Sequence, residues 1–564
     1  MTAMVRPVAG AARREYFPIV VGVIMVGAAL IFLIYPIANV IILAFLANGK
    51  DLALVNLTLD NFERFFVSAS YQRAFWNSIV AGGGATVLAT ALSLPMAYAL
   101  TRVRMPFRPL ILALSVIPLI APPFIGAYAW IMLLGNNGMI TQVLHSSLGL
   151  RLPTIYGPFG VIVALALSYF PYVFLIVQGA LAAADPAIEE AAQMAGASRW
   201  RIIRTITFPV IVPAVAAGAL IVFIKAIGDF GVPAILGGEF QVLPTLIYYQ
   251  IHGFFNLNAG SAIAIVNVAL TIAALAILSA VSRRWTFSTI TGSARGAVRL
   301  STPGMRVLAN AFVWLVLTLA LLPQAVVLLY SFAERWGDSL LPSVYGLDNY
   351  RRVLRDVAEP IWNTVILATV ATLLCLAFGM ITAYAAVRGK AIAKWALDLS
   401  IMVPFVLPGL VVGVAYLAAF NSGPIVLTGT ATILVLAYFT RRVGFIFRSA
   451  VAAIGQVDPL LEQASTICGA SWAATMRRIT MPLIAPALIA GAVLVFATLI
   501  GEISATVLLY SAQWKTLSIA IYEFVLGNEL AKASALGSLS NLLTLILVLA
   551  ASTLLGRNMS DMFR

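Results

Sequence analysis

Long apolar stretches separated by short polar segments run along the whole chain. A helix needs about 20 mostly apolar residues to cross a bilayer, and twelve stretches of the sequence meet that requirement. In the first half they cover 18–46, 74–101, 110–135, 155–183, 208–236 and 259–282. In the second half they cover 307–332, 361–387, 396–420, 429–454, 481–511 and 533–556. The pattern predicts an all-α polytopic membrane protein with about twelve transmembrane helices.

Composition supports this fold class and excludes others. Hydrophobic residues make up 62% of the chain and charged residues 10%, against about 45–50% and about 25% in a soluble domain. A soluble enzyme, a disordered chain and a nucleic-acid-binding protein are therefore excluded, despite the net charge of +14. With the N-terminus inside, 21 of the 35 Lys and Arg residues fall in inside segments. The positive-inside rule then predicts that both termini are cytoplasmic.

The chain repeats itself. Asp185-Pro186 recurs as Asp458-Pro459, and further upstream Trp76-Asn77 recurs as Trp362-Asn363. The two members of each pair are separated by a fixed number of residues, the repeat offset. Further matches at the offsets of these two pairs indicate two fused copies of a six-span unit. We expect units at 1–290 and 307–564, with a basic cytoplasmic linker at 291–306. Because each unit has an even number of spans, the copies are predicted to be parallel repeats, with a transport pathway between them.

A loop between the fourth and fifth spans of each copy is too long to be a simple turn. In copy one, Asp185 is a good N-cap before Pro186 at the first helical position. Gly196 can end this helix in a left-handed cap, and Ser198 can start a second short helix. The pattern therefore predicts two short helices at the membrane surface. The candidate functional residues of this loop are Glu189, Glu190, Ala191, Ala192 and Gly196.

The second copy keeps the same frame with changes at its start. Its corresponding residues are Glu462, Gln463, Ala464, Ser465 and Gly469. Together the two loops resemble the EAA loop of the permeases of binding-protein-dependent ABC importers, and the resemblance covers nearly the whole chain. The alternative is a surface loop that merely connects two spans.

The resemblance implies the MetI-like permease fold, made of two parallel six-helix repeats. It implies that the ten loop residues couple the permease to a homodimeric ATP-binding subunit that carries the ATP and Mg²⁺. It also implies a periplasmic solute-binding protein, a place in the lipid bilayer of the bacterial inner membrane, and alternating access. Gln463 stands where the family has Glu, so the contacts that the two loops make with the ATP-binding subunit need not be equally strong.

The chain itself lacks a nucleotide-binding motif. Gly49-Lys50 and Gly389-Lys390 are not followed by Ser or Thr, so no Walker A pattern is present. We therefore expect no catalytic residue and no cofactor in this chain. Gly82-Gly83-Gly84 lies within an apolar span, where close helix packing is the expected role.

Ionisable residues inside spans are costly and usually face a cavity or a partner. Asp229 and Glu502 are equivalent in the two copies, and Lys225 lies four residues before Asp229, at the spacing of an intrahelical pair. Arg441 and Arg442 have no charged equivalents in copy one. One interpretation is a structural ion pair with Glu502. The other is an electropositive outer vestibule for an anionic solute, in which case all five residues are pathway candidates.

The solute is less well defined by the sequence. The stretches 501–506 and 438–442 resemble the second half of ferric iron permeases, which favours iron(III). Phosphonate or other anionic solutes, thiamine and polyamines stay open, as does an ATP-independent secondary transporter. No cluster of residues predicts a bound metal: Cys375 and Cys468 fit neither a metal site nor a disulfide framework. Two prolines in the third span of each copy, Pro118 with Pro122 and Pro404 with Pro408, predict helix breaks.

Overall fold

The computed structural model describes residues 23–47, 56–150, 153–284, 302–336, 341–389 and 391–555. In these ranges nine helices are long and apolar enough to cross a membrane, and the number rises to twelve if three bent helix pairs each count as one span. The predicted all-α membrane fold with about twelve spans is therefore confirmed. Both termini and most of the predicted linker, residues 291–301, lie outside the described residues.

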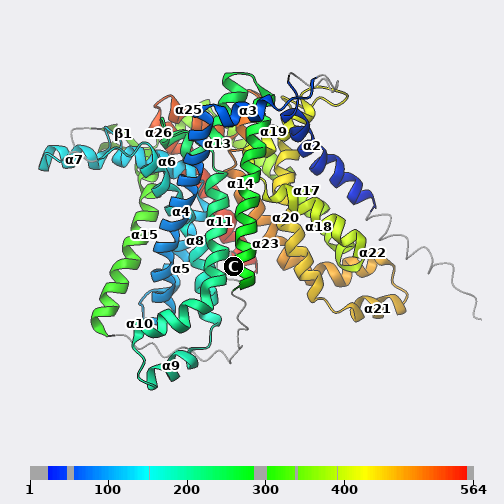
Figure 1. The fold of residues 1–564 in the computed structure, drawn as a ribbon, viewed down its shortest axis with the longest axis horizontal. Coiled ribbons are helices and arrows are strands. Elements are labelled where there is room, and N and C mark those ends of the chain that lie inside the picture. Colours follow the sequence, from blue (N-terminus) through cyan, green and yellow to red (C-terminus); the bar gives the residue numbers. More distant parts are fainter. Residues whose placement is uncertain are drawn as a thin grey trace, which may run out of the picture. The chain divides into compact units, whose positions relative to one another are not determined.

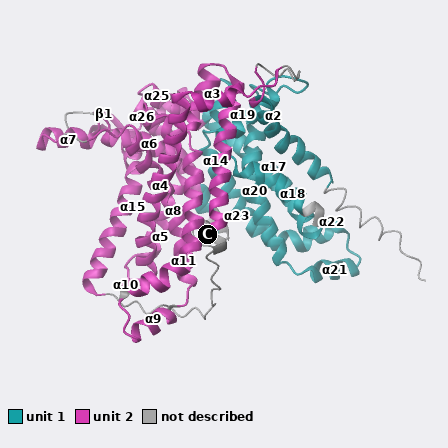
Figure 2. Cartoon of the chain, viewed as in Figure 1, with its two compact units in different colours: residues 1–43, 359–516, 547–556 teal, residues 44–358, 517–546, 557–564 magenta. Residues whose placement is uncertain are grey.

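Figure 1 labels the helices, which form two compact units (Figure 2). Unit 1 contains residues 1–43, 359–516 and 547–556, and unit 2 contains residues 44–358, 517–546 and 557–564. The units are composed differently from the two sequence repeats, because each takes in the first span of the other half and unit 2 also takes in residues 517–546 of the second half. In unit 1, for example, Tyr416 of the second half donates a hydrogen bond of 2.7 Å to the backbone carbonyl of Phe32 in the first span.

Unit 2 holds the second to sixth spans of the first half, together with the first span and most of the last span of the second half. Its helices up to the surface loop are α3 (Asp60–Val67), α4 (Ala69–Arg102), α5 (Arg108–Ile120), α6 (Pro123–Leu134), α7 (Met139–Leu148) and α8 (Pro158–Ala183). Then follow α9 (Pro186–Met194), α10 (Arg199–Ile202), η3 (Ile203–Thr207), α11 (Phe208–Ile227), α12 (Gly231–Leu236), α13 (Leu243–Tyr248), η4 (Tyr249–Gly253) and α14 (Leu257–Arg284). The remaining elements are α15 (Pro303–Phe332), α16 (Asp348–Asp356), α25 (Leu517–Leu526) and the first part of α26 (Leu530–Leu555).

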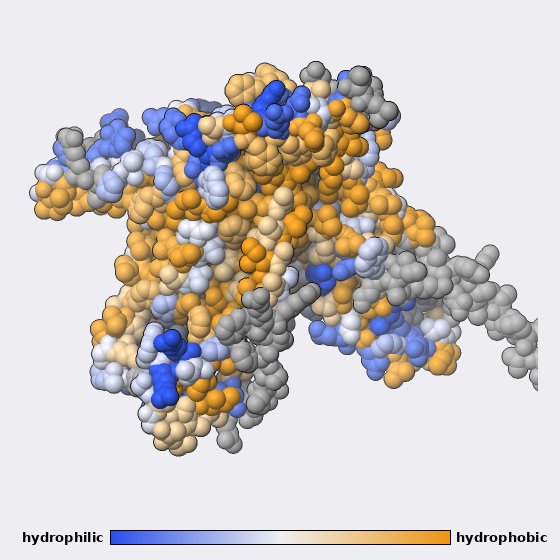
Figure 3. Space-filling view, in the orientation of Figure 1, coloured by the Kyte–Doolittle hydropathy of each residue, from blue (hydrophilic) through white to orange (hydrophobic). Residues whose placement is uncertain are grey.

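A two-stranded antiparallel sheet in unit 2 joins β1 (Ala333–Trp336) to β2 (Pro342–Tyr345), with Ala333 opposite Tyr345. Figure 3 shows hydrophobic side chains along the flank of this unit over α15 and hydrophilic side chains gathered near α10. This distribution is the one expected of a bilayer-facing flank that ends at a polar surface.

Unit 1 contains the first span, Val23–Ala44, which includes η1 (Leu30–Ile34) and α2 (Tyr35–Ala44), and most of the second half. Its further helices are α17 (Ala358–Arg388), α18 (Ala391–Val406), α19 (Gly409–Phe420), α20 (Ala431–Gln456), α21 (Pro459–Ile467), α22 (Trp472–Thr475), η5 (Met476–Thr480), α23 (Met481–Ile500) and α24 (Thr506–Leu509).

The predicted breaks in the third span of each half are confirmed. The helices bend by 97° between α5 and α6 and by 110° between α18 and α19. Pro122 and Pro408 stand directly before the second helix of each pair. A proline has no backbone N–H and its ring clashes with the carbonyl four residues before it, so a continuous helix is disfavoured there.

The fifth and eleventh spans end earlier in the chain than the sequence predicted. Helix α11 ends at Ile227 with Gly228 as its C-cap, and α23 ends at Ile500 with Gly501 as its C-cap. Asp229 and Glu502 therefore lie in the turns that follow. The sequence predicted that Lys225 and Asp229 share one helix, and the structure shows that they do not. The glycines explain the difference, because they favour helix termination over continuation.

The glycine run of α4 packs as the sequence predicted. A Cβ atom on Gly82 would clash with a methyl carbon of Ile227, and one on Gly84 would lie 2.7 Å from Ile162. Gly83 between them faces open space. Two of the three glycines therefore allow α11 and α8 to approach α4 closely.

Candidate functional site

Helix α9 lies at one end of unit 2, beyond the helices of the bundle (Figure 1). It begins where the backbone N–H of Ala187 donates a hydrogen bond of 2.9 Å to Oδ1 of Asp185. It ends in a Schellman motif, in which the N–H of Ala197 bonds the carbonyl of Ala192 at 3.0 Å. Gly196 has the positive φ of 82° that this motif requires. Both predicted ends of the helix are confirmed.

Helix α21 repeats this construction in unit 1. The N–H of Leu460 donates to Oδ1 of Asp458 at 2.9 Å, and the N–H of Ala470 bonds the carbonyl of Ser465 at 3.1 Å. Gly469 has a φ of 83°. Each helix is followed by a second short helix, which Ser198 or Ser471 caps through its hydroxyl oxygen. The local sequence is sufficient for this result, because every cap lies within a few residues of its partner.

The predicted residues of these two helices fall into an exposed set and a half-buried set. The exposed ones are Ala191, Gly196, Gln463, Ala464 and Gly469. The half-buried ones are Glu189, Glu190, Ala192, Glu462 and Ser465. The last residue of each helix is apolar and exposed: Met194 is 85% exposed and Ile467 is 86% exposed. These two positions correspond in the repeat that joins Asp185 to Asp458, so both helices present an apolar side chain at the same place.

Glu189 turns towards the protein and not towards the exposed side of α9. Its carboxylate accepts hydrogen bonds from Nε and Nη2 of Arg102, at 3.0 and 3.1 Å. It also accepts one from the hydroxyl of Thr207 at 3.0 Å. Arg102 is the last residue of α4 and Thr207 the last residue of η3. We call this arrangement, in which one carboxylate ties three elements together, the first carboxylate clamp.

Glu462 makes the second carboxylate clamp in unit 1. Its carboxylate lies 3.2 Å from Nε of Arg388, the last residue of α17, and accepts a hydrogen bond of 3.0 Å from Thr480. The same arginine donates through Nη2 to the carbonyl of Val457 at 3.1 Å. The two clamps thus use the same residue types on elements that correspond in the two repeats.

Sequence reasoning missed Arg102, Thr207, Arg388 and Thr480. The signal that identifies them is the pair of repeat offsets. The two arginines are separated by the offset that joins Trp76 to Trp362, and the two threonines by the offset that joins the Asp-Pro pairs. Each position therefore matches its partner in the register of the repeat, although no local motif marks it.

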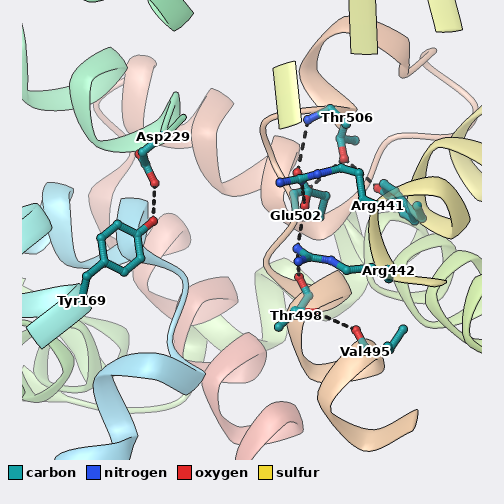
Figure 4. A network of polar contacts seen from close by, with 10 residues as sticks. Tyr169, Asp229, Arg441, Arg442, Val495, Thr498, Glu502 and Thr506 are labelled. Carbon is teal, nitrogen blue, oxygen red and sulfur yellow. Dashed lines mark hydrogen bonds and ion pairs between the residues drawn. The ribbon is translucent and has the colours of Figure 1, made fainter. Parts of the chain in front are cut away.

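A second pair of equivalent carboxylates lies in the turns after α11 and α23. In unit 2, Oδ2 of Asp229 accepts a hydrogen bond of 2.8 Å from the hydroxyl of Tyr169 (Figure 4). Its Oδ1 accepts one of 2.8 Å from the N–H of Val232. The side chain therefore fixes the turn that leads into α12. Lys225 lies half-buried in the last turn of α11.

In unit 1, Glu502 caps the corresponding turn by accepting a hydrogen bond of 3.2 Å from the N–H of Ala505. It is also paired with two arginines of α20: Arg441 bonds it directly, and Nη2 of Arg442 lies 3.0 Å from Oε2 (Figure 4). The side chain of Glu502 is 4% exposed. The ion pair expected from the sequence is present, and its buried carboxylate faces two positive charges.

Gly409 explains how Arg441 fits beside the broken span. A Cβ atom on Gly409 would lie 2.6 Å from Nη1 of Arg441 and 2.7 Å from Cβ of Ser504. The guanidinium group therefore lies against the backbone at the start of α19, where the span is bent. Within the described ranges, no group of three or more His, Cys, Asp or Glu residues is arranged to hold a metal ion.

Comparison with known proteins identifies the family to which the chain belongs. The model of the family described as "Binding-protein-dependent transport system inner membrane component" matches twice, at residues 89–287 and 375–561. The ferric transport system permease protein FbpB of Actinobacillus pleuropneumoniae is 31% identical over 540 residues, which are 93% of this chain and 76% of the relative.

Two further relatives cover different shares of the chain. A putative ferric transport system permease protein, FbpB 1 of Haemophilus influenzae, is 32% identical over 81% of this chain and 73% of its own length. A putative 2-aminoethylphosphonate transport system permease protein, PhnV of Salmonella typhi, is 29% identical over 40% of this chain and 87% of its own length. With both halves matched by the family model, this chain belongs to the inner membrane components of binding-protein-dependent transport systems, as a fused two-domain ABC importer permease.

Proposed function

We propose that this permease imports iron(III) across the bacterial inner membrane. The similarity to two ferric transport permeases extends over most of the chain and includes both halves, which supports a common substrate class. A periplasmic solute-binding protein would deliver the iron, and the permease would pass it through the bilayer by alternating access. Iron is the cargo in this proposal and needs no permanent metal site in the permease.

The energy would come from a separate homodimeric ATPase subunit, which would carry the ATP and the Mg²⁺. The observation that carries this part is the matching of α9 and α21, from now on the docking helices. They have the same N-cap, the same Schellman motif and the same exposed apolar end. A partner with two identical clefts would be served by two such helices in one chain.

The exposed side chains of the docking helices support binding to a protein partner. Met194 and Ile467 are almost fully exposed at the ends of short helices, where each would bury its apolar surface on docking. Burial of such a side chain is worth about 1.5–3 kcal/mol. Ala191 and Ala464 keep the neighbouring surface narrow enough to enter a cleft.

The orientation follows from the docking helices and the charge distribution. The ATPase is cytoplasmic, so α9 and α21 would face the cytoplasm, and both termini would lie on that side. The excess of Lys and Arg in the inside segments supports the same orientation. The binding protein would then dock on the opposite side.

The pathway would include the charged residues near the two carboxylate turns. These are Lys225, Asp229, Arg441, Arg442 and Glu502. In unit 1 two arginines bind one buried carboxylate, so these three side chains together carry one excess positive charge. Such a site would favour an anionic or anion-complexed solute and would disfavour a polycation.

A second candidate substrate class is a phosphonate. Its support is the match to a putative 2-aminoethylphosphonate permease over 40% of this chain. Because a phosphonate is an anion, it suits the same positive charge. The wider match to the ferric permeases places iron(III) first.

The proposal is tested by copurification of the ATPase with docking-helix variants. Gly196→Val and Gly469→Val introduce β-branched residues at φ of 82° and 83°, where a Cβ atom meets no neighbour but the backbone is strained. The strain costs about 1–3 kcal/mol and should distort the end of each docking helix. We expect the double variant to lose the ATPase. If the ATPase copurifies in full and transport continues, the docking proposal is rejected.

A further inference from the structure

The docking helices are joined to more of the membrane domain than the chain order suggests. Helix α9 follows α8 in sequence and precedes α11, so the backbone connects it to the fourth and fifth spans. The first carboxylate clamp adds the end of the second span, because Arg102 is the last residue of α4. The contact spans 87 residues of sequence. A third span is therefore tied directly to the docking helix.

The chemistry of the clamp makes this joint stiff. Two nitrogens of Arg102 bind the two oxygens of Glu189, and the side chains are 9% and 18% exposed. A two-point bond between charged groups fixes orientation as well as distance. Partial burial reduces the screening by water and salt that weakens ion pairs on the surface. The joint should therefore resist both separation and rotation.

A π-helical segment brings the third element into the clamp. Thr207 ends η3 and Thr480 ends η5, and both segments stand directly before the fifth span of their half. Single π turns within helices are rare and occur frequently at functional sites. Here each places a threonine hydroxyl 3.0 Å from the clamp carboxylate.

The second clamp has one additional contact. Arg388 binds Glu462 and also the carbonyl of Val457, which directly precedes the N-cap residue Asp458. The arginine therefore holds both the first turn of α21 and the backbone that enters it. Each unit thus contains a carboxylate clamp at the corresponding place, and the two clamps differ slightly in their hydrogen bonds.

We propose that Arg102 and Arg388 are positioning residues that transmit the movement of each docking helix to the second span of its half. This inference rests on the proposed docking of an ATPase. The clamps make each docking helix, the end of α4 or α17 and the base of α11 or α23 move as one body. When the arginine is replaced, the docking helix keeps its chain connections but loses the joint to the second span.

The test uses the full transporter, reconstituted with its ATPase and binding protein. The variant is Arg102→Gln with Arg388→Gln, and the readout is solute transported per ATP hydrolysed. We expect this ratio to fall roughly fivefold or more, the range of typical coupling between two sites, with the ATPase still bound. The matched control is Arg104→Gln, since Arg104 is exposed and lies two residues beyond Arg102. It should behave as the unaltered protein does.

A charge exchange separates positioning from folding. Arg102→Glu combined with Glu189→Arg, together with Arg388→Glu and Glu462→Arg, keeps each ion pair with its charges reversed. We expect this variant to recover part of the transport ratio that either single-sided change loses. An unchanged ratio in Arg102→Gln with Arg388→Gln overturns the inference. Failure of the unaltered permease to bind any ATPase instead overturns the proposed function, so the two failures are distinguishable.

Discussion

Tyr169 and Arg442 occupy equivalent positions of the two repeats, and each binds the carboxylate of the corresponding turn. Tyr169 donates its hydroxyl to Asp229 at 2.8 Å, whereas Arg442 donates a guanidinium N–H to Glu502 at 3.0 Å. The turn is thus built in the same way in both halves, but one copy uses a neutral partner and the other a charged one. The two halves of the transporter therefore differ in the charge of the side chain that binds the turn carboxylate.

This asymmetry predicts different costs for neutralising the two carboxylates. Glu502→Gln leaves two guanidinium groups in a buried place without this carboxylate, which should cost about 3–5 kcal/mol. Asp229→Asn keeps an oxygen that can accept from Val232 and a group that can bond Tyr169, so the expected cost is about 1 kcal/mol. Thermal unfolding of the purified permease in lipid nanodiscs measures both. Equal shifts in Tm would contradict the structural role assigned to the arginines.

The exposed ends of the docking helices give a second prediction. Met194→Glu and Ile467→Glu should weaken ATPase binding by about tenfold or more, because a charged group would replace an apolar one in a buried contact. Affinity measurements with the isolated ATPase subunit test this. Leu148→Glu is the control, since Leu148 is 65% exposed on α7, at the other end of unit 2 from α9. If the control weakens binding as much, the effect is not specific to docking.

Helix packing in unit 2 gives a third prediction. A Cβ atom on Gly218 of α11 would lie 2.8 Å from the backbone Cα of Val173 in α8. Gly218→Ala should therefore force the two helices apart at a cost of about 1–3 kcal/mol. Gly83→Ala meets no neighbour and gains about 1 kcal/mol of helix propensity. The two Tm values should move in opposite directions, and a stabilising Gly218→Ala would show that the helices separate easily.

Local features of the loops and spans could be predicted from the sequence because each depends on near neighbours. Asp185 and Asp458 cap helices that begin one residue later, and Gly196 and Gly469 end them. The prolines before α6 and α19 break the third spans for the same reason. Each of these features is decided within one or two turns of helix.

Contacts between distant segments could not be predicted in this way. Hydropathy identifies the first span but not its packing in unit 1, where Phe32 meets Tyr416. Arg102 is an ordinary basic residue at the end of a span until Glu189 is placed beside it. The end of α11 was misplaced because Gly228 and Asp229 lie between two apolar segments that together resemble one span.

The most direct test of the account is ATPase stimulation in the complete transporter. The permease is reconstituted with its ATPase and binding protein, and hydrolysis is measured with iron(III), a phosphonate, thiamine and spermidine in turn. We predict a stable complex in which the iron(III)-loaded binding protein stimulates hydrolysis. Stimulation by the phosphonate alone would change the substrate. Transport that continues when no ATPase can bind would contradict the account and identify a secondary transporter.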